Sequence, residues 1–156
     1  MEHTVVDINL QNVAEIEFTY RNKIPASKRP TLTTSRDSYK IFLGHWNMDR
    51  IQFIEEIKIL LLNASRKVLG IVHLGTGGIS ATVVDLRIIY GIALKTCACQ
   101  IILCHNHPSG GLTPSMSDQK ITRKLKEAGE LLDINFLDHL IISDTEYYSF
   151  ADEGLL

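Results

Sequence analysis

Apolar residues along the chain fall into five runs that are short enough to be β-strands. The runs are rich in Ile, Leu and Val and cover residues 57–62, 68–74, 100–103, 133–142 and 147–150. Short aliphatic runs bounded by turn residues are typical of buried strands. The polar stretch at residues 63–66 lies between the first two runs, so we expect these two strands to form a hairpin.

Three other segments have apolar residues at helical spacing. The expected helices begin at Thr34 or Ser35, at Asp85 and at Ser115, which are residue types that cap a helix N-terminus. The second helix is expected to end near residue 97 and the third near residue 132. Strands that alternate with helices predict an α/β fold, in which helices cover both faces of a mixed sheet as a three-layer α/β/α sandwich.

The N-terminal part of the chain has a different pattern. Residues 13–20 alternate imperfectly and predict an edge strand, while residues 23–30 contain two prolines and three basic residues and predict an exposed linker. We therefore divide the chain into an N-terminal extension, residues 1–34, and a main domain, residues 35–156. An exposed edge strand would allow a homodimer to form by strand pairing.

Composition and charge narrow the class of protein. A chain of 156 residues, with 45% hydrophobic and 22% charged residues, suits one soluble globular domain. The net charge of −2 provides no overall basic surface for nucleic acid, although the basic linker could contact an acidic partner instead of being merely solvated. No membrane span or signal peptide is visible. Cys97, Cys99 and Cys104 lack metal-binding spacing, which favours reduced, buried thiols and a cytoplasmic location.

The segment from His105 to Asp118 holds the residues with the clearest chemical role. His105 and His107 lie two residues apart at the end of a predicted strand, and alternate residues of an extended chain point to the same side. A loop rich in Pro and Gly follows, and then a helix start that carries Asp118. Two imidazoles and a carboxylate are three protein ligands for Zn²⁺, and an open fourth position is typical of catalytic zinc. Ser115 and Asp118 also suit a helix start, so capping is an alternative role for them.

The same residues resemble a known family. The motif His105-Asn106-His107-Pro108-Ser109-Gly110, followed by Ser115 and Asp118, resembles the JAMM motif of JAB/MPN metal-dependent hydrolases and, more narrowly, the signature of the RadC family. Other RadC-like segments occur in the same order, and they are Gly77-Gly78, Asp85-Leu86-Arg87, Ile101-Ile102-Leu103 and Leu137-Asp138-His139-Leu140-Ile141-Ile142. The resemblance implies a JAB/MPN (cytidine-deaminase-like) fold. It also implies the short, stand-alone RadC-like form, because no helix-hairpin-helix region is visible before the domain.

The resemblance also indicates where a catalytic carboxylate is expected. In JAMM hydrolases a glutamate on an earlier strand carries the proton, and counting back from Gly77-Gly78 its position here is His73. His73 could serve as the base, bind the metal as a fourth ligand, or leave a weak site without catalysis. Glu56 is the other candidate, because the hairpin is expected to place it opposite His73, although a surface role is its alternative. On this interpretation, His73→Glu would raise hydrolytic activity.

Two further roles complete the predicted site. Ser115 has an oxyanion-stabilising role in the resembling enzymes, and that role competes with helix capping for the same hydroxyl. Asp138 and His139 are interpreted as a structural pair and not as partners of a metal-binding histidine.

The implied activity is hydrolysis of an amide or isopeptide bond by metal-activated water, with one Zn²⁺ bound by His105, His107 and Asp118. A protein or peptide substrate is expected, and the family's link to DNA repair implies an association with DNA. Two rival hypotheses remain open. One is a catalytically weak metal-binding or DNA-associated module, which His73 favours, and the other is a protein-interaction domain without the chemistry.

Overall fold

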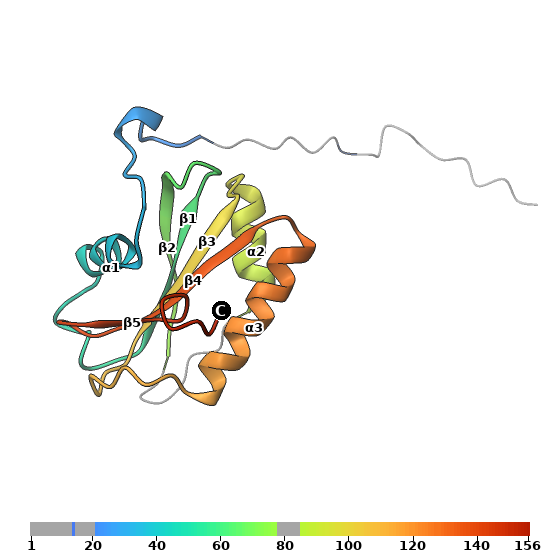
Figure 1. Ribbon diagram of the computed structural model, residues 1–156. Coiled ribbons are helices and arrows are strands. Elements are labelled where there is room, and N and C mark those ends of the chain that lie inside the picture. Colours follow the sequence, from blue (N-terminus) through green and yellow to red (C-terminus); the bar gives the residue numbers. More distant parts are fainter. Residues whose placement is uncertain (1–13, 15–20, 78–84) are drawn as a thin grey trace, which may run out of the picture.

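The computed structural model describes residues 14, 21–77 and 85–156, and its centre is a mixed five-stranded sheet (Figure 1). The strands lie in the order β2-β1-β3-β4-β5. Strands β3 and β4 are parallel, and the other neighbours are antiparallel. The strand bounds are Glu56–Leu62 for β1, Val68–Thr76 for β2, Gln100–Asn106 for β3, Asn135–Ile142 for β4 and Tyr147–Ser149 for β5.

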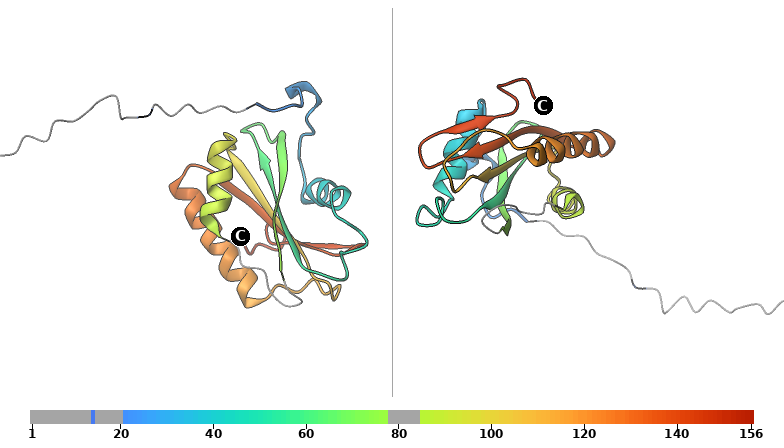
Figure 2. Two further views of the ribbon diagram at one scale, coloured as in Figure 1. Left: turned by 180° about the vertical axis from the view of Figure 1, so that it is seen from behind. Right: turned by 90° about the horizontal axis from the view of Figure 1, so that it is seen from below.

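Helices cover both faces of this sheet, which confirms the predicted three-layer sandwich. Helix α1 (Ser35–Gly44) lies on one face, and helices α2 (Leu86–Lys95) and α3 (Met116–Leu131) lie on the other, as the left view of Figure 2 shows. Thr34, Asp85 and Ser115 are the three N-caps, and each side chain accepts a backbone N–H of the first turn. The helix starts read from the sequence are therefore confirmed. Among the residues that the structure describes, no helix is long and apolar enough to span a membrane.

The alternation of side chains along the central strands gives the molecule two cores. On the side of α2 and α3, odd-numbered residues of β1 and β3 pack against buried helix residues, namely Ile57, Ile59, Leu61, Ile101, Leu103, Ile89, Ala93 and Leu125. On the side of α1, the even-numbered strand residues Leu60, Leu62, Ile102 and Cys104 share a core with Phe42 of the helix. Strands β1 and β3 are therefore buried on both faces, which explains their continuous apolar runs.

Two element boundaries differ from the predicted ones for a local reason, while the turn at Arg66 lies where it was expected. Arg66, Cys97 and Asp133 adopt positive φ angles of 57°, 52° and 54°. A residue in this left-handed region reverses the chain direction, so α2 ends at Lys95 and β4 begins at Asn135. Cys97 is exposed as a result, which corrects the expectation of buried thiols, and only Cys104 is fully buried among the three free cysteines.

The N-terminal extension is described only from residue 21 onward, apart from residue 14. The edge strand expected at residues 13–20, and the dimer contact based on it, lie outside the described residues. The linker at residues 23–30 is largely exposed, includes a 3-10 helix at Ala26–Lys28, and is joined to the β1–β2 turn by a bond from Lys67 Nζ to the Ala26 carbonyl (3.1 Å). Leu32 is already part of the α1-side core. The division at residue 34 remains a prediction.

Gly129 of α3 is required by close packing, which gives a direct test of the core. A Cβ atom there would lie 2.4 Å from the Ile134 carbonyl oxygen and 2.9 Å from the Tyr90 hydroxyl. We expect Gly129→Ala to lower the free energy of unfolding by about 1–3 kcal/mol, because overpacking forces the backbone apart. The matched control is Gly91→Ala in α2, where no atom lies within 4 Å and alanine should stabilise the helix. Urea unfolding of both variants makes the comparison, and equal stabilities would contradict it.

Candidate metal centre

The end of strand β3 brings the two predicted histidine ligands together. His105 is on β3 and is almost fully buried, and His107 follows the strand directly. Their Nε2 atoms lie 3.0 Å apart. Asp118, in the first turn of α3, places Oδ1 3.3 Å from His105 Nε2 and Oδ2 3.8 Å from His107 Nε2. The three side chains therefore converge on one point, as their placement in the sequence predicted.

The hydrogen bond of His107 indicates which kind of ion fits between the three side chains. His107 Nδ1 lies 2.6 Å from the Gly111 carbonyl oxygen, and because a carbonyl only accepts, Nδ1 carries the proton. In the neutral ring the Nε2 lone pair then faces His105 and the Asp118 carboxylate. Burial, reinforced by His107 and opposed by Asp118, lowers the pKa of His105, so a proton is a poor candidate to hold the three groups together. A metal cation fits the same position.

The spacing of the three groups also suits a small divalent cation. Ligand atoms about 2.0–2.2 Å from a tetrahedral ion lie about 3.4 Å from one another. One ligand atom from each of the three residues fits within a 4.8 Å cluster. Two imidazole nitrogens and one carboxylate oxygen are a donor set that zinc prefers, and three protein ligands leave a coordination position open.

Asp118 is held in place by the cap of its own helix. Its Oδ2 accepts hydrogen bonds from the backbone N–H of Ser115 (2.7 Å) and from the Ser115 hydroxyl (2.6 Å). The Ser115 Oγ in turn accepts the backbone N–H of Asp118 at 3.1 Å. This capping box leaves Oδ1 directed at His105. Ser115 thus lies beside the cluster and positions the Asp118 carboxylate, and its expected role toward an oxyanion remains a prediction.

His139 contacts the cluster, which corrects the expectation that it is no partner of His105, although its backbone N–H does donate to Asp138 Oδ1 (2.7 Å) as a structural pair would. His139 Nε2 lies 2.8 Å from His105 Nδ1, and the ring is fully buried. Burial, and then the neighbouring His105 and His107, hold the pKa of His139 well below its ordinary value. Asp138 points to the other face of the sheet, where it accepts hydrogen bonds from Ser149 Oγ (2.6 Å) and the Ala151 backbone N–H (3.0 Å). Adjacent strand residues face opposite sides, which separates the two roles.

Asn106, between the two histidines, fixes the segment that precedes β1. Its Nδ2 donates to the carbonyl oxygens of Ile51 (2.6 Å) and Ile54 (2.9 Å), and its Oδ1 accepts the backbone N–H of Glu56 (2.7 Å). The side chain is fully buried, and all three partners are backbone groups. One residue of β3 therefore sets the position of the chain around Glu55.

The structure places His73 and Glu56 away from the centre. The register shifts between Ile57 and Lys58, so His73 pairs with Lys58 and not with Glu56. Cross-strand partners share a face, and the Lys58 Nζ lies 4.0 Å from the centroid of the Trp46 ring in the α1-side core. His105 pairs with Ile57, which faces α2 and α3.

Glu56 and His73 instead take part in a separate cluster of charges. Glu56 is buried, with Oε2 3.3 Å from Lys58 Nζ and 3.8 Å from His73 Nδ1. Lys58 Nζ also donates to the His45 carbonyl oxygen at 2.9 Å. This arrangement satisfies a buried carboxylate on the far side of the sheet. The geometry therefore supports neither residue as a base at the metal centre.

Glu55 is an acidic residue that lines the cavity beside the cluster, and the sequence interpretation missed it. It lines a cavity of about 160 Å³ together with His105, Asp118, Ser117 and His139. Glu55 precedes β1, and its carbonyl accepts the Gly77 backbone N–H at 2.8 Å. The available signal was the pair Glu55-Glu56 at the start of a predicted strand, because one of two adjacent residues must face α3.

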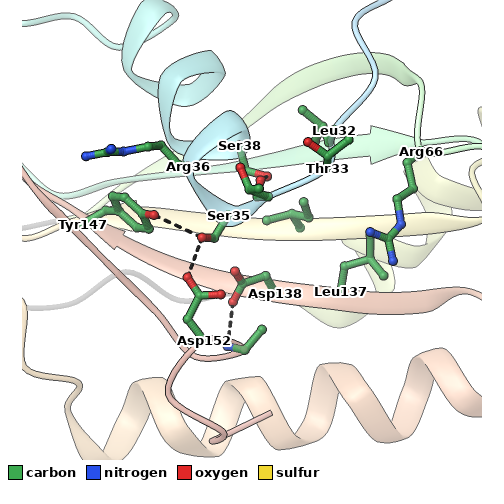
Figure 3. Close-up of a pocket in the computed structure, with 13 residues that line it drawn as sticks. Leu32, Thr33, Ser35, Arg36, Ser38, Arg66, Leu137, Asp138, Tyr147 and Asp152 are labelled. Carbon is green, nitrogen blue, oxygen red and sulfur yellow. Dashed lines mark hydrogen bonds between the residues drawn. The ribbon is translucent and has the colours of Figure 1, made fainter.

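A larger cavity lies on the α1 side and shares none of the predicted site residues (Figure 3). Its volume is about 540 Å³, and Arg66, Asp138 and Asp152 are among its lining residues. The Ser35 hydroxyl donates to Asp152 Oδ2 at 2.5 Å and lies 3.1 Å from the Tyr147 hydroxyl, as the dashed lines in Figure 3 mark. The sheet separates this cavity from the metal centre.

Comparison with known proteins agrees with the fold. A family profile described as "RadC-like JAB domain" matches residues 32–155. The molecule is thus a JAB-type α/β domain with a histidine, histidine and aspartate cluster at the end of its central strand. The chain belongs to the RadC family.

Relatives similar to this chain carry the printed name "UPF0758 protein". The one from Flavobacterium johnsoniae is 46% identical over 92% of this chain and 62% of its own length. The one from Porphyromonas gingivalis is 42% identical over 92% of this chain and 63% of its own length. The chain therefore spans a little over three fifths of the length of these relatives.

Removal of one imidazole tests the ligand set. We expect His107→Ala to retain its far-UV circular dichroism but to lose stoichiometric metal after loading with Zn²⁺, because the sheet that carries the site does not need the metal to form. The control is His45→Ala, since His45 is exposed at the end of α1 and its Nδ1 contacts only the Ile41 carbonyl in the described part of the chain. Elemental analysis reports the metal content. An unchanged zinc content in His107→Ala would exclude it as a ligand.

Proposed function

We propose that this protein is a zinc-dependent hydrolase that cleaves amide or isopeptide bonds in a protein or peptide substrate. The main observation in support is the convergence of His105, His107 and Asp118 beside a cavity that also contains a carboxylate from another element, Glu55. Membership of the RadC family, with its JAB-type domain, favours the same class of chemistry. Because the longer relatives contain additional chain, the proposal concerns the domain described.

A zinc ion in this site would lower the pKa of a water molecule and polarise the substrate carbonyl. The protein's own residues would then handle the protons. Glu55, placed in the cavity, would accept the proton of the attacking water and deliver it to the leaving amine. Ser115 keeps Asp118 oriented through the capping box, so its hydroxyl would have to leave Oδ2 to reach an oxyanion.

The position of Glu55 also bears on the alternative of a weak or inactive metal-binding module. That alternative depended on a histidine in place of the catalytic glutamate. His73 contacts Glu56 and Thr76 Oγ1 (3.1 Å) on the other side of the sheet, so its identity says nothing about the base. Glu55 lines the cavity beside the cluster and offers a carboxylate without it, which favours the catalytic hypothesis.

Replacing the proposed base tests the reaction. We expect Glu55→Gln to keep zinc but to lose roughly 10²–10⁴-fold in kcat, which is the usual contribution of a positioned general base. The assay is a panel of fluorogenic peptide amides and isopeptide-linked peptides, with zinc content measured in parallel. His73→Gln is the matched control and should retain activity, and His73→Glu should bring no gain. Full activity of Glu55→Gln, or loss in His73→Gln alone, would overturn the assignment of the base.

A specific charge distribution favours DNA association as a second function. Five cationic residues and no acidic residue occur from Arg21 to Arg36. Arg66 and Lys67 adjoin this segment, since Thr31 forms a β-bridge with Lys67. None of these seven cations forms an ion pair with another residue that the structure describes. We call these residues the basic end, and such a cluster suits phosphate groups despite the net negative charge of the chain.

The salt dependence of DNA binding tests the basic end. Lys23→Gln with Lys28→Gln should weaken binding to a double-stranded oligonucleotide, and should reduce the slope of log K against log salt by about 2, since each phosphate contact contributes about 0.9. Lys124→Gln with Lys126→Gln on α3 is the control of equal charge. Binding that falls only in the α3 variant, or no binding by the wild type, would exclude the basic end.

The cytoplasmic location expected from the free thiols remains a prediction.

A further inference from the structure

A chain of buried hydrogen bonds leads from the backbone of α3 to the metal centre. Thr122 Oγ1 lies 2.7 Å from the Asp118 carbonyl oxygen and 2.7 Å from His139 Nδ1. On the other side of the same ring, His139 Nε2 lies 2.8 Å from His105 Nδ1. Thr122, His139 and His105 are all buried, and Phe150 stacks on the His139 ring at 4.8 Å with an interplanar angle of 8°. Water therefore has little access to these hydrogen bonds.

These hydrogen bonds have one consistent order of donors and acceptors when the histidine rings are neutral. A backbone carbonyl can only accept, so the single hydroxyl proton of Thr122 goes to the Asp118 carbonyl. Thr122 Oγ1 is then left with lone pairs, and His139 must donate to it through an Nδ1–H. A neutral imidazole has one N–H, so His139 Nε2 is an acceptor and receives the Nδ1–H of His105. In the neutral His105 ring the remaining nitrogen, Nε2, therefore carries a lone pair and faces His107 and Asp118.

We propose that Thr122 and His139 are positioning residues that set the tautomer of His105 and so keep its Nε2 free to bind a metal ion. The proposal rests on the proposed metal centre, because tautomer choice matters only if Nε2 is a ligand. It assigns to α3 two separate contributions. The helix supplies Asp118 as a ligand, and one turn later it supplies the hydroxyl that fixes the protonation of the ligand on β3.

His107 offers an internal reference for this assignment. Its Nδ1–H donates to the Gly111 carbonyl, so its tautomer is fixed by a different group. A change at Thr122 should alter His105 and His139 but not His107. A general disturbance of the fold would alter all three rings.

Thr122→Val removes the hydroxyl while preserving the shape of the side chain. His139 Nδ1 then has no acceptor, so the proton is expected to move to Nε2, which donates to His105 Nδ1. His105 would then carry its proton on Nε2, at the position of the metal. Because loss of an outer hydrogen-bond partner usually costs about 10–100-fold in metal affinity, we expect a loss of that size. Thr122→Ser retains the hydroxyl and should restore both the tautomer and the affinity.

The experiment uses the full chain and two measurements. Long-range ¹⁵N–¹H correlation spectra of the metal-free protein at neutral pH report which nitrogen of each histidine ring carries the proton. Chelator competition with Zn²⁺ reports the affinity. We expect the Nδ1–H form of His105 in the wild type and in Thr122→Ser, the Nε2–H form in Thr122→Val, and the weakest zinc binding in Thr122→Val.

Each outcome decides between the alternatives. An Nε2–H form of His105 in the wild type overturns the proposal, even if Thr122→Val fails to fold. An unchanged tautomer and unchanged zinc affinity in Thr122→Val also overturn it. If the wild type shows the expected tautomer, and Thr122→Val reverses it, but neither protein binds zinc, then the hydrogen-bond assignment stands and the proposed metal function fails.

Discussion

The site depends on the alternation of side chains at the end of strand β3. This alternation directs two histidines to one face of the sheet and Asn106 to the other. β3 lies between β1 and β4, so its register is fixed by two neighbours. His105 and His107 therefore face α3, while Asn106 faces the segment before β1 and binds three of its backbone groups. A carbonyl or N–H group that is buried without a hydrogen-bond partner costs free energy. The segment before β1 therefore keeps the position in which Asn106 bonds these three backbone groups. Three consecutive residues thus place two imidazoles and, through the backbone of Glu56, the neighbouring Glu55.

Helix α3 is the second element that the site depends on, and its first turn has two roles. The Asp118 carboxylate completes the capping box with Ser115 and also faces His105 and His107. A capped helix end is stabilised by about 1 kcal/mol, so the hydrogen bonds that orient the Asp118 carboxylate also stabilise the helix. Gly129 near the other end allows the Tyr90 hydroxyl of α2 to reach the Leu125 carbonyl. This close contact holds α3 against α2.

The carboxylates at the start of β1 show how strongly one residue of register matters. Glu55 lines the cavity at the metal centre, whereas Glu56 is buried on the α1 side against Lys58. Removing one partner of a buried ion pair typically costs about 3–5 kcal/mol, so Glu56 has a clear structural reason to be acidic. A shift of one residue exchanges the two faces of a strand. The irregularity between Ile57 and Lys58 is enough to change the partner of His73 and with it the inferred base.

The sequence alone determined the layered α/β fold, the helix starts and the convergence of His105, His107 and Asp118, because each depends on local periodicity and spacing. Strand alternation relates two residues that are two positions apart, and a capping box relates two that are three apart, so neither needs knowledge of distant contacts. Tertiary structure alone decided that Glu55 and not His73 lies at the centre, and that His139 contacts His105. Those relations join elements far apart in the chain, and their geometry depends on a register shift between β1 and β2 and on the parallel register of β3 with β4, which no local pattern encodes.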